Sequence, residues 1–105
     1  MSCEVSERFG LPEEDVARYQ AVFATYPQIR QVLIYGSRAK GTHRPASDID
    51  LTIVGDLDWP TFTRIEAEID ELLLPYQVDL SLYSQIDNPA LIEHIQRVGK
   101  TFFQS

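Results

Sequence analysis

The sequence predicts a small α/β domain in which a mixed β-sheet carries helices mainly on one face. Segments with an apolar residue at every second position alternate along the chain with segments whose apolar residues recur every three or four positions. The first two strand segments are close enough in sequence to pair antiparallel. A complete helix joins the second to the third, so we expect those two strands to be parallel neighbours in a three-stranded sheet.

The first helix is expected to begin at Pro12, after a polar segment, residues 1–10, that we expect to fray. Three acidic residues follow Pro12, where they favour the positive N-terminal end of the helix dipole. An apolar stripe then runs along the helix until Pro27, which disfavours helical geometry at the preceding residue. The stripe consists of Val16, Tyr19, Phe23 and Tyr26.

Three segments have the composition and alternation of strands: Ile29–Tyr35, Asp48–Val54 and Tyr76–Tyr83. Between the first two, Ser37–Ser47 contains glycine, proline and serine and predicts a loop. A second helix is expected from Asp58 to Leu74, and a third from Asn88 through Phe102, with Leu91, Ile95, Val98 and Phe102 on one face.

Length and composition favour one folded domain, residues 1–105, since 44% of the 105 residues are hydrophobic. The single cysteine, Cys3, fits a reducing compartment. We also expect neither a signal peptide nor a membrane span, and therefore a soluble cytoplasmic protein. The net charge of −7 argues against direct nucleic-acid binding, which needs a basic surface.

One short segment differs from this acidic background. Arg38, Lys40 and Arg44 lie within seven residues that contain no acid. A basic segment on an acidic chain suits a small anionic ligand better than a polymer. Gly36-Ser37, just before it, ends a strand; the glycine permits close approach to the backbone, and Ser37 and nearby N–H groups could hold phosphate oxygens. Taken alone, a Gly-Ser pair is more often an ordinary turn.

Three aspartates complete the candidate site. Asp48 and Asp50 project to the same side of one strand, and two neighbouring carboxylates repel unless a cation such as Mg²⁺ lies between them. Taken alone, such a pair is more often a solvated strand edge. Asp79 lies in the next strand, which we expect to be central and apolar, so that an unpaired acid there would be costly. Three carboxylates could bind two Mg²⁺ ions.

Together, Tyr35–Gly41, Arg44 and Ser47–Leu51 resemble the signature of the DNA polymerase β-type nucleotidyltransferase superfamily, and most closely that of the minimal nucleotidyltransferases. The resemblance extends from about Ile29 to Phe103 and includes Val78-Asp79-Leu80.

The resemblance implies a role for each matching residue. Gly36 and Ser37 would hold the terminal phosphates of ATP, and Arg38, Lys40 and Arg44 would contact the triphosphate. Asp48 and Asp50 would bind both Mg²⁺ ions. Asp79 would bind the catalytic ion and help to activate the attacking hydroxyl.

The short segment after Asp79 holds one predicted helix, so we expect the acceptor to be a small molecule or to lie on another chain. The resemblance implies an antitoxin that transfers AMP to a tyrosine of a HEPN-domain ribonuclease toxin. Two alternatives stay open: a non-catalytic module that masks its partner, and an antibiotic-modifying nucleotidyltransferase. His94, on the last helix, is expected to face solvent or a partner, and Trp59 to cover the sheet.

Overall fold

The structure, a computed structural model, describes residues 7–8, 11–36, 39 and 48–105. The helices and strands follow one another in the order β1 (Glu7–Arg8), β2 (Leu11–Pro12), α1 (Glu13–Ala24), β3 (Ile29–Tyr35), β4 (Ile49–Gly55), α3 (Trp59–Glu71), β5 (Val78–Leu82), the 3₁₀-helix η1 (Tyr83–Gln85), α4 (Pro89–Val98) and β6 (Lys100–Gln104).

The main sheet has four strands in the order β5-β4-β3-β6, and β1 and β2 form a separate antiparallel pair. β3 pairs antiparallel with both β4 and β6, whereas β4 and β5 are parallel. The antiparallel pairing of the first two predicted strands and the parallel pairing of the second and third are therefore confirmed. Both β5 and β6 are edge strands.

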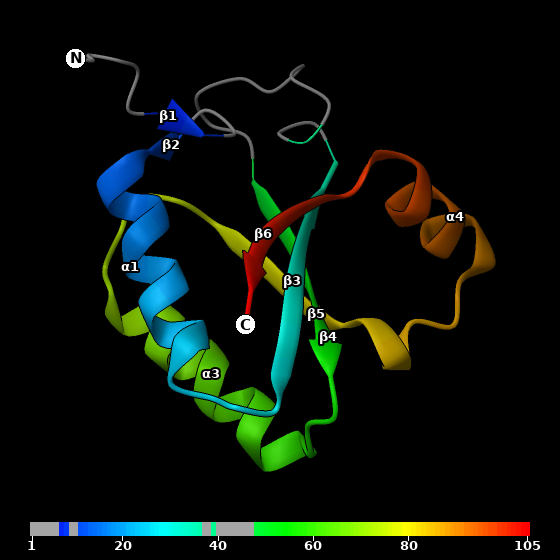
Figure 1. Cartoon of the computed structure of the whole chain (residues 1–105), viewed down its shortest axis with the longest axis horizontal. Coiled ribbons are helices and arrows are strands. Elements are labelled where there is room, and N and C mark those ends of the chain that lie inside the picture. The colour runs from blue at the N-terminus through cyan, green and yellow to red at the C-terminus, as the bar shows by residue number, and fades with distance from the viewer. Residues whose placement is uncertain (1–6, 9–10, 37–38, 40–47) are drawn as a thin grey trace.

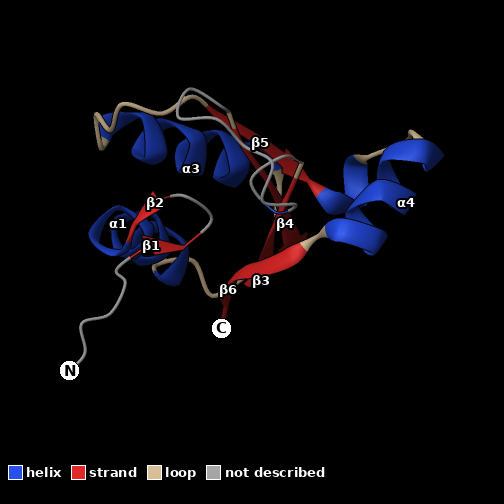
Figure 2. Cartoon of the chain, turned by 90° about the horizontal axis from the view of Figure 1, so that it is seen from above, coloured by secondary structure: helices blue, strands red, loops and turns tan. Residues whose placement is uncertain are grey.

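The helices lie on both sides of this sheet, but not equally. α1 and α3 pack together on one side, and α4 lies beyond the other side (Figures 1 and 2). The expectation that helices lie mainly on one face is thus confirmed. No other described α-helix lies on the side that carries α4, and the polar side chains of β4 and β5 point to this side.

The hydrophobic core fills the space between the sheet and the pair α1 and α3. Alternate residues of the central strands face it because strand side chains alternate between the two faces. The core includes Val16, Tyr19, Val22, Phe23, Ile29, Val32, Ile34, Ile49, Leu51, Ile53, Phe62, Ile65, Ile69, Leu82 and Phe102. Since β4 presents Ile49, Leu51 and Ile53 to this core, Asp50 and Thr52 necessarily face the other side.

The prediction for the last helix was wrong in its second half. α4 ends at Val98, and Lys100–Gln104 forms β6, so the sheet has four strands rather than three. The backbone turns at Gly99, whose N–H donates to the carbonyl of Ile95 at 2.7 Å and whose missing side chain leaves room for that carbonyl. The residues that follow, including two phenylalanines, favour strands, and the open edge of β3 pairs with them.

Both later helices begin as the sequence predicts. The Asp58 carboxylate accepts a hydrogen bond from the N–H of Thr61 at 3.0 Å, and the Asn88 side chain accepts from the N–H groups of Ala90 and Leu91. A proline follows each of these caps, where its lack of an N–H costs nothing. In the part of the chain that the structure describes, no helix has the length and apolarity needed to cross a bilayer.

The packing of β6 yields a test of its place in the core. Phe102 is 1% exposed, and its ring lies 6.3 Å from those of Tyr19 and Phe23. We expect Phe102→Ala to lower the free energy of unfolding by about 3–5 kcal/mol in urea denaturation, because it leaves a cavity under the edge strand. The control Gln104→Ala, at an exposed position of β6, should stay within about 0.5 kcal/mol. Equal effects of the two substitutions would contradict this packing.

Candidate active site

The centre of the candidate site is a pair of aspartates on adjacent strands. In the parallel register of β4 and β5, Asp50 is the direct partner of Asp79. In the antiparallel register of β3 and β4, Asp50 is also the partner of Tyr35. Partners in register project to the same face of a sheet, so Tyr35, Asp50 and Asp79 form one row on the side away from α1 and α3.

Gly36 brings the end of β3 against this row. Its φ of 80° lies in the region that side chains disfavour, and a Cβ added there would overlap Oδ2 of Asp50. The glycine therefore allows the Asp50 carboxylate to lie directly against the backbone at the point where the chain leaves β3. The sequence predicted close approach at Gly36; the structure shows that one of the approaching groups is a carboxylate of the same chain.

The electrostatics of Asp50 show that the three predicted aspartates act on one another. Asp50 is half-buried, and burial, followed by the charges of Asp79 and Asp48, raises its pKa above the ordinary value for an aspartate. The charge of His94 lowers the pKa of Asp50. Three mutually repelling carboxylates are the kind of oxygen donors that Mg²⁺ prefers, because a divalent cation offsets their repulsion.

Asp79 corrects one part of the sequence argument. β5 is an edge strand rather than a central one, and Asp79 is exposed. Of Asp50 and Asp79, Asp50 is the half-buried one, and burial raises its pKa. Asp48, which precedes β4 by one residue, is also exposed. An exposed Asp79 at the sheet edge is accessible to a group carried by another molecule.

The donor types suit magnesium, but the described side chains do not form a ready metal cluster. Among residues 11–36, 39 and 48–105, no group of three or more His, Cys, Asp or Glu side chains is arranged to hold a metal ion. The binding of Mg²⁺, and of two ions in particular, stays a prediction.

Tyr35 forms the floor of the site next to the aspartates, a role that the sequence did not reveal. Tyr35 is 8% exposed, and burial raises the pKa of its phenol. A hydrogen bond with the Ser81 side chain lowers this pKa, whereas the charges of Asp50 and Asp79 raise it further. Its side chain therefore reaches from β3 across β4 to β5. Thr52, fully buried beneath this face, donates to the carbonyl of Ser81 at 3.5 Å.

Ser37, Arg38, Lys40 and Arg44 lie outside the described residues, so their predicted contacts with phosphate stay predictions. Within that segment only Ala39 is described, and it is buried. The structure thus brings together Gly36, Asp48, Asp50 and Asp79 from the predicted set.

A separate cavity of about 400 Å³ lies between α3 and the start of β5. None of the predicted site residues lines it. Its lining is apolar apart from Tyr19, Tyr76, Gln77, Glu66 and Asp70. Because no predicted phosphate or metal ligand lines this cavity, we assign no nucleotide to it.

Comparison with known families agrees with the predicted resemblance. The fold is that of a nucleotidyltransferase domain. The family described as polymerase beta, nucleotidyltransferase, matches residues 18–105, and the chain belongs to this family. No curated protein gives a significant match.

Several solved structures share the fold. A toxin–antitoxin complex with AMP-PNP is 21% identical and has a TM-score of 0.67, over 90% of this chain and 75% of that chain. A Shewanella oneidensis complex of a tri-AMPylated HEPN toxin with an MNT antitoxin is 16% identical, with a TM-score of 0.64 over 89% and 72% of the two chains. A structure described as a minimal nucleotidyltransferase is 23% identical, with a TM-score of 0.62 over 92% and 98%.

The contact between Gly36 and Asp50 can be measured by a double-mutant cycle. Gly36→Ala should destabilise the fold through backbone strain, by about 1 kcal/mol or more, and through overlap with the Asp50 carboxylate. In an Asp50→Ala background only the strain remains, so the same change should cost less, by about 0.5–3 kcal/mol in urea denaturation. An identical cost in both backgrounds would show that Asp50 does not pack on Gly36.

The raised pKa of Asp50 predicts a pH-dependent stability. An unfolded aspartate titrates at about pH 3.9, so ionised Asp50 destabilises the fold increasingly as the pH rises from there through its raised native pKa. We expect Asp50→Asn to be more stable than wild type near neutral pH and the advantage to vanish below about pH 4. Thermal midpoints across this range measure it, with Asp56→Asn at an exposed position as control. A pH-independent difference would contradict the interpretation.

Proposed function

We propose that this protein is a Mg²⁺-dependent adenylyltransferase that transfers AMP from ATP to a tyrosine hydroxyl of a HEPN-domain ribonuclease, and so acts as the antitoxin of a toxin–antitoxin pair. The observation that carries the proposal is the register of β4 and β5, which places Asp50 opposite Asp79 beside the glycine corner that ends β3. Membership of the nucleotidyltransferase family supports the reaction class.

The proposed reaction is an in-line displacement. The tyrosine oxygen of the partner forms a bond to the α-phosphorus of ATP, the bond from that phosphorus to the bridging oxygen breaks, and pyrophosphate leaves. Asp79, exposed at the sheet edge, accepts the proton of the hydroxyl. Asp48, Asp50 and Asp79 would hold Mg²⁺, which neutralises charge that develops on the phosphates. Ser37 and the cations Arg38, Lys40 and Arg44 would orient the triphosphate.

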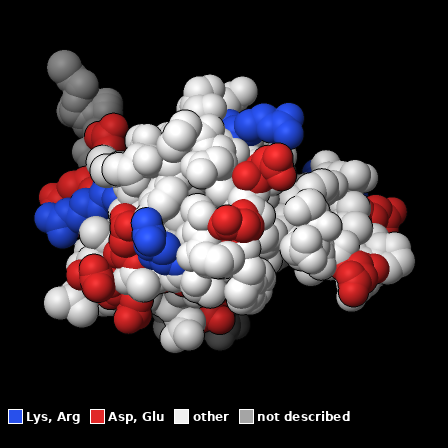
Figure 3. Space-filling view, turned by 90° about the horizontal axis from the view of Figure 1, so that it is seen from below, with Lys and Arg blue, Asp and Glu red and all other residues white. Residues whose placement is uncertain are grey.

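In the proposed reaction the acceptor belongs to another protein. Asp79 lies on an edge strand, where the hydroxyl of a second chain can reach it. The solved complexes that share the fold include one of an MNT antitoxin with an AMPylated HEPN toxin. The chain itself is acidic, and Figure 3 shows Asp and Glu side chains spread over one face with separate Lys and Arg residues among them. Such a surface suits a basic, RNA-binding partner, and the proposed role places both proteins in the cytoplasm.

A single experiment separates the proposal from its alternatives. The protein is incubated with ATP, Mg²⁺ and a HEPN-domain ribonuclease, which is first sought in the neighbouring reading frames, and the intact mass of that partner is measured. We expect AMP-sized gains on the partner. Inhibition of the partner without any gain would contradict the proposal and favour a masking module. Transfer to an aminoglycoside in place of the partner would favour the small-molecule alternative.

The same assay tests the site. Asp48→Asn/Asp50→Asn should lower the transfer rate by more than about 100-fold, since residues that only orient metal ligands already contribute about 10–100-fold. The thermal midpoint of the variant should not fall, because neither amide disturbs the core. ATP should raise the wild-type midpoint more with Mg²⁺ than without it, and this difference should be lost in the variant. Transfer at the wild-type rate would refute the assignment of these two residues.

A further inference from the structure

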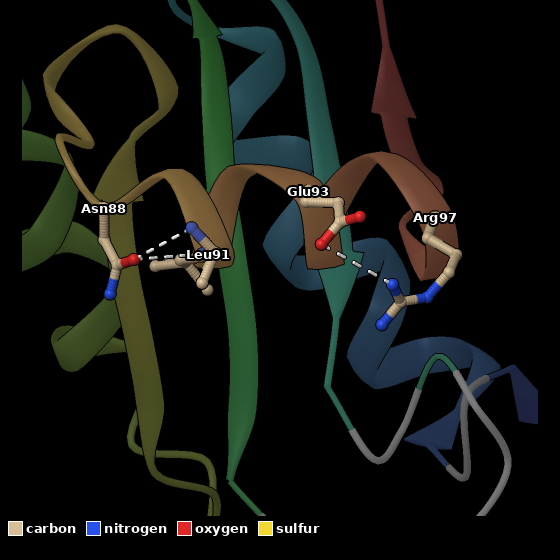
Figure 4. Close-up of polar contacts among 5 residues, drawn as sticks. Asn88, Leu91, Glu93 and Arg97 are labelled. Carbon is tan, nitrogen blue, oxygen red and sulfur yellow. Dashed lines mark hydrogen bonds and ion pairs between the residues drawn. The ribbon is translucent and has the colours of Figure 1, made fainter.

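Helix α4 is the one described helix on the side of the sheet that carries the aspartates (Figure 2). Its start is fixed by Asn88 and Pro89, and its buried residue Ile95 is 1% exposed. Figure 4 shows the Asn88 cap at its first turn and the pair of Glu93 with Arg97, 3.9 Å apart, along an exposed part of the helix. The position of α4 is therefore set by its cap and by Ile95, and an exposed ion pair adds little.

His94, which the sequence predicts to face solvent or a partner, lies between Glu93 and Ile95 on this helix. It is half-buried, and its ring centroid lies 6.2 Å from that of Tyr35, at an interplanar angle of 81°. This is the edge-to-face arrangement that aromatic rings favour. Since Tyr35 is the register partner of Asp50, the imidazole lies over the same row of side chains that forms the candidate site.

The charged groups that influence Asp50 come from two places, the neighbouring strand positions and helix α4. Asp79 lies opposite it on β5 and Asp48 lies two residues before it on β4, and both carboxylates repel its negative charge. Among the described residues, His94 on α4 is a group whose charge favours ionised Asp50. The imidazole thus opposes, from α4, the repulsion that Asp48 and Asp79 exert on the most buried carboxylate of the site.

We propose that His94 is a positioning residue of the transfer site: held by the Tyr35 ring, its imidazole keeps the Asp50 carboxylate aligned with that of Asp79. This inference rests on the proposed function. It assigns to α4 a role in the reaction, although the helix contributes no residue to the predicted phosphate or metal ligands. The role differs from that of Asp50 because His94 acts on the reaction through another residue.

The test uses AMP transfer to the HEPN-domain partner with ATP and Mg²⁺, with kcat and KM for ATP measured separately. We expect His94→Ala to lower kcat by about 10–100-fold, the range found for residues that orient metal ligands, and to change KM little. His94→Gln, which keeps an N–H donor and a similar size, should restore part of kcat. The matched control is Glu93→Gln, at the residue that precedes His94 and forms the exposed ion pair with Arg97. This variant should behave as wild type.

The outcomes separate the inference from the function on which it rests. If wild type transfers AMP and His94→Ala retains its kcat, the inference is overturned and the proposed function stands. A rise in KM alone would also overturn it, because that result indicates a contact with ATP. If both His94 variants lose kcat and both also lose thermal stability to the same extent, His94 has a structural role and the inference is overturned. If wild type transfers no AMP, the proposed function fails and the inference fails with it.

Discussion

The parallel pairing of β4 with β5 is the constraint on which the rest of the site depends. This register makes Asp50 and Asp79 direct partners, and the burial of Ile49, Leu51 and Ile53 on one face commits the aspartates to the other. A shift of one residue would bury the carboxylates and expose the core, so the apolar residues of β4 enforce the position of the acidic ones. The position of the site therefore follows from core packing. The stability of the core offsets the unfavourable repulsion between the carboxylates.

Much of this arrangement could be predicted from the sequence because the signals are local. The alternation in β3 and β4, the caps at Asp58 and Asn88, and the helix between β4 and β5 each depend on neighbouring residues. β6 was missed because Val98 and Phe102 continue the spacing of the preceding helix. The strand composition of Thr101, Phe102 and Phe103 after a glycine was the signal that could have revealed it.

The sequence could not reveal on which face of the sheet a helix packs or which strand lies at the edge of the sheet. Nothing local shows that α4 lies on the aspartate side of the sheet, so His94 could not be placed beside Tyr35. Nor does the alternation of β5 show that it is an edge strand, which is why Asp79 was expected to be enclosed although it is exposed. This exposure bears on the proposed function, because Asp79 on the open edge is accessible to another molecule while Asp50 stays half-buried against Gly36.

The central claim is that a divalent cation and the nucleotide bind together at the row formed by Asp48, Asp50 and Asp79. The most direct measurement is a ¹⁵N-resolved NMR spectrum of the protein with AMP-PNP, recorded as Mn²⁺ replaces Mg²⁺ in small steps. Paramagnetic broadening falls off steeply with distance, so we expect the amide signals of Gly36, Ile49, Asp50 and Asp79 to be lost first. Early loss of signals from Glu66 and Asp70, at the cavity beside α3, with the aspartate row unaffected, would contradict it.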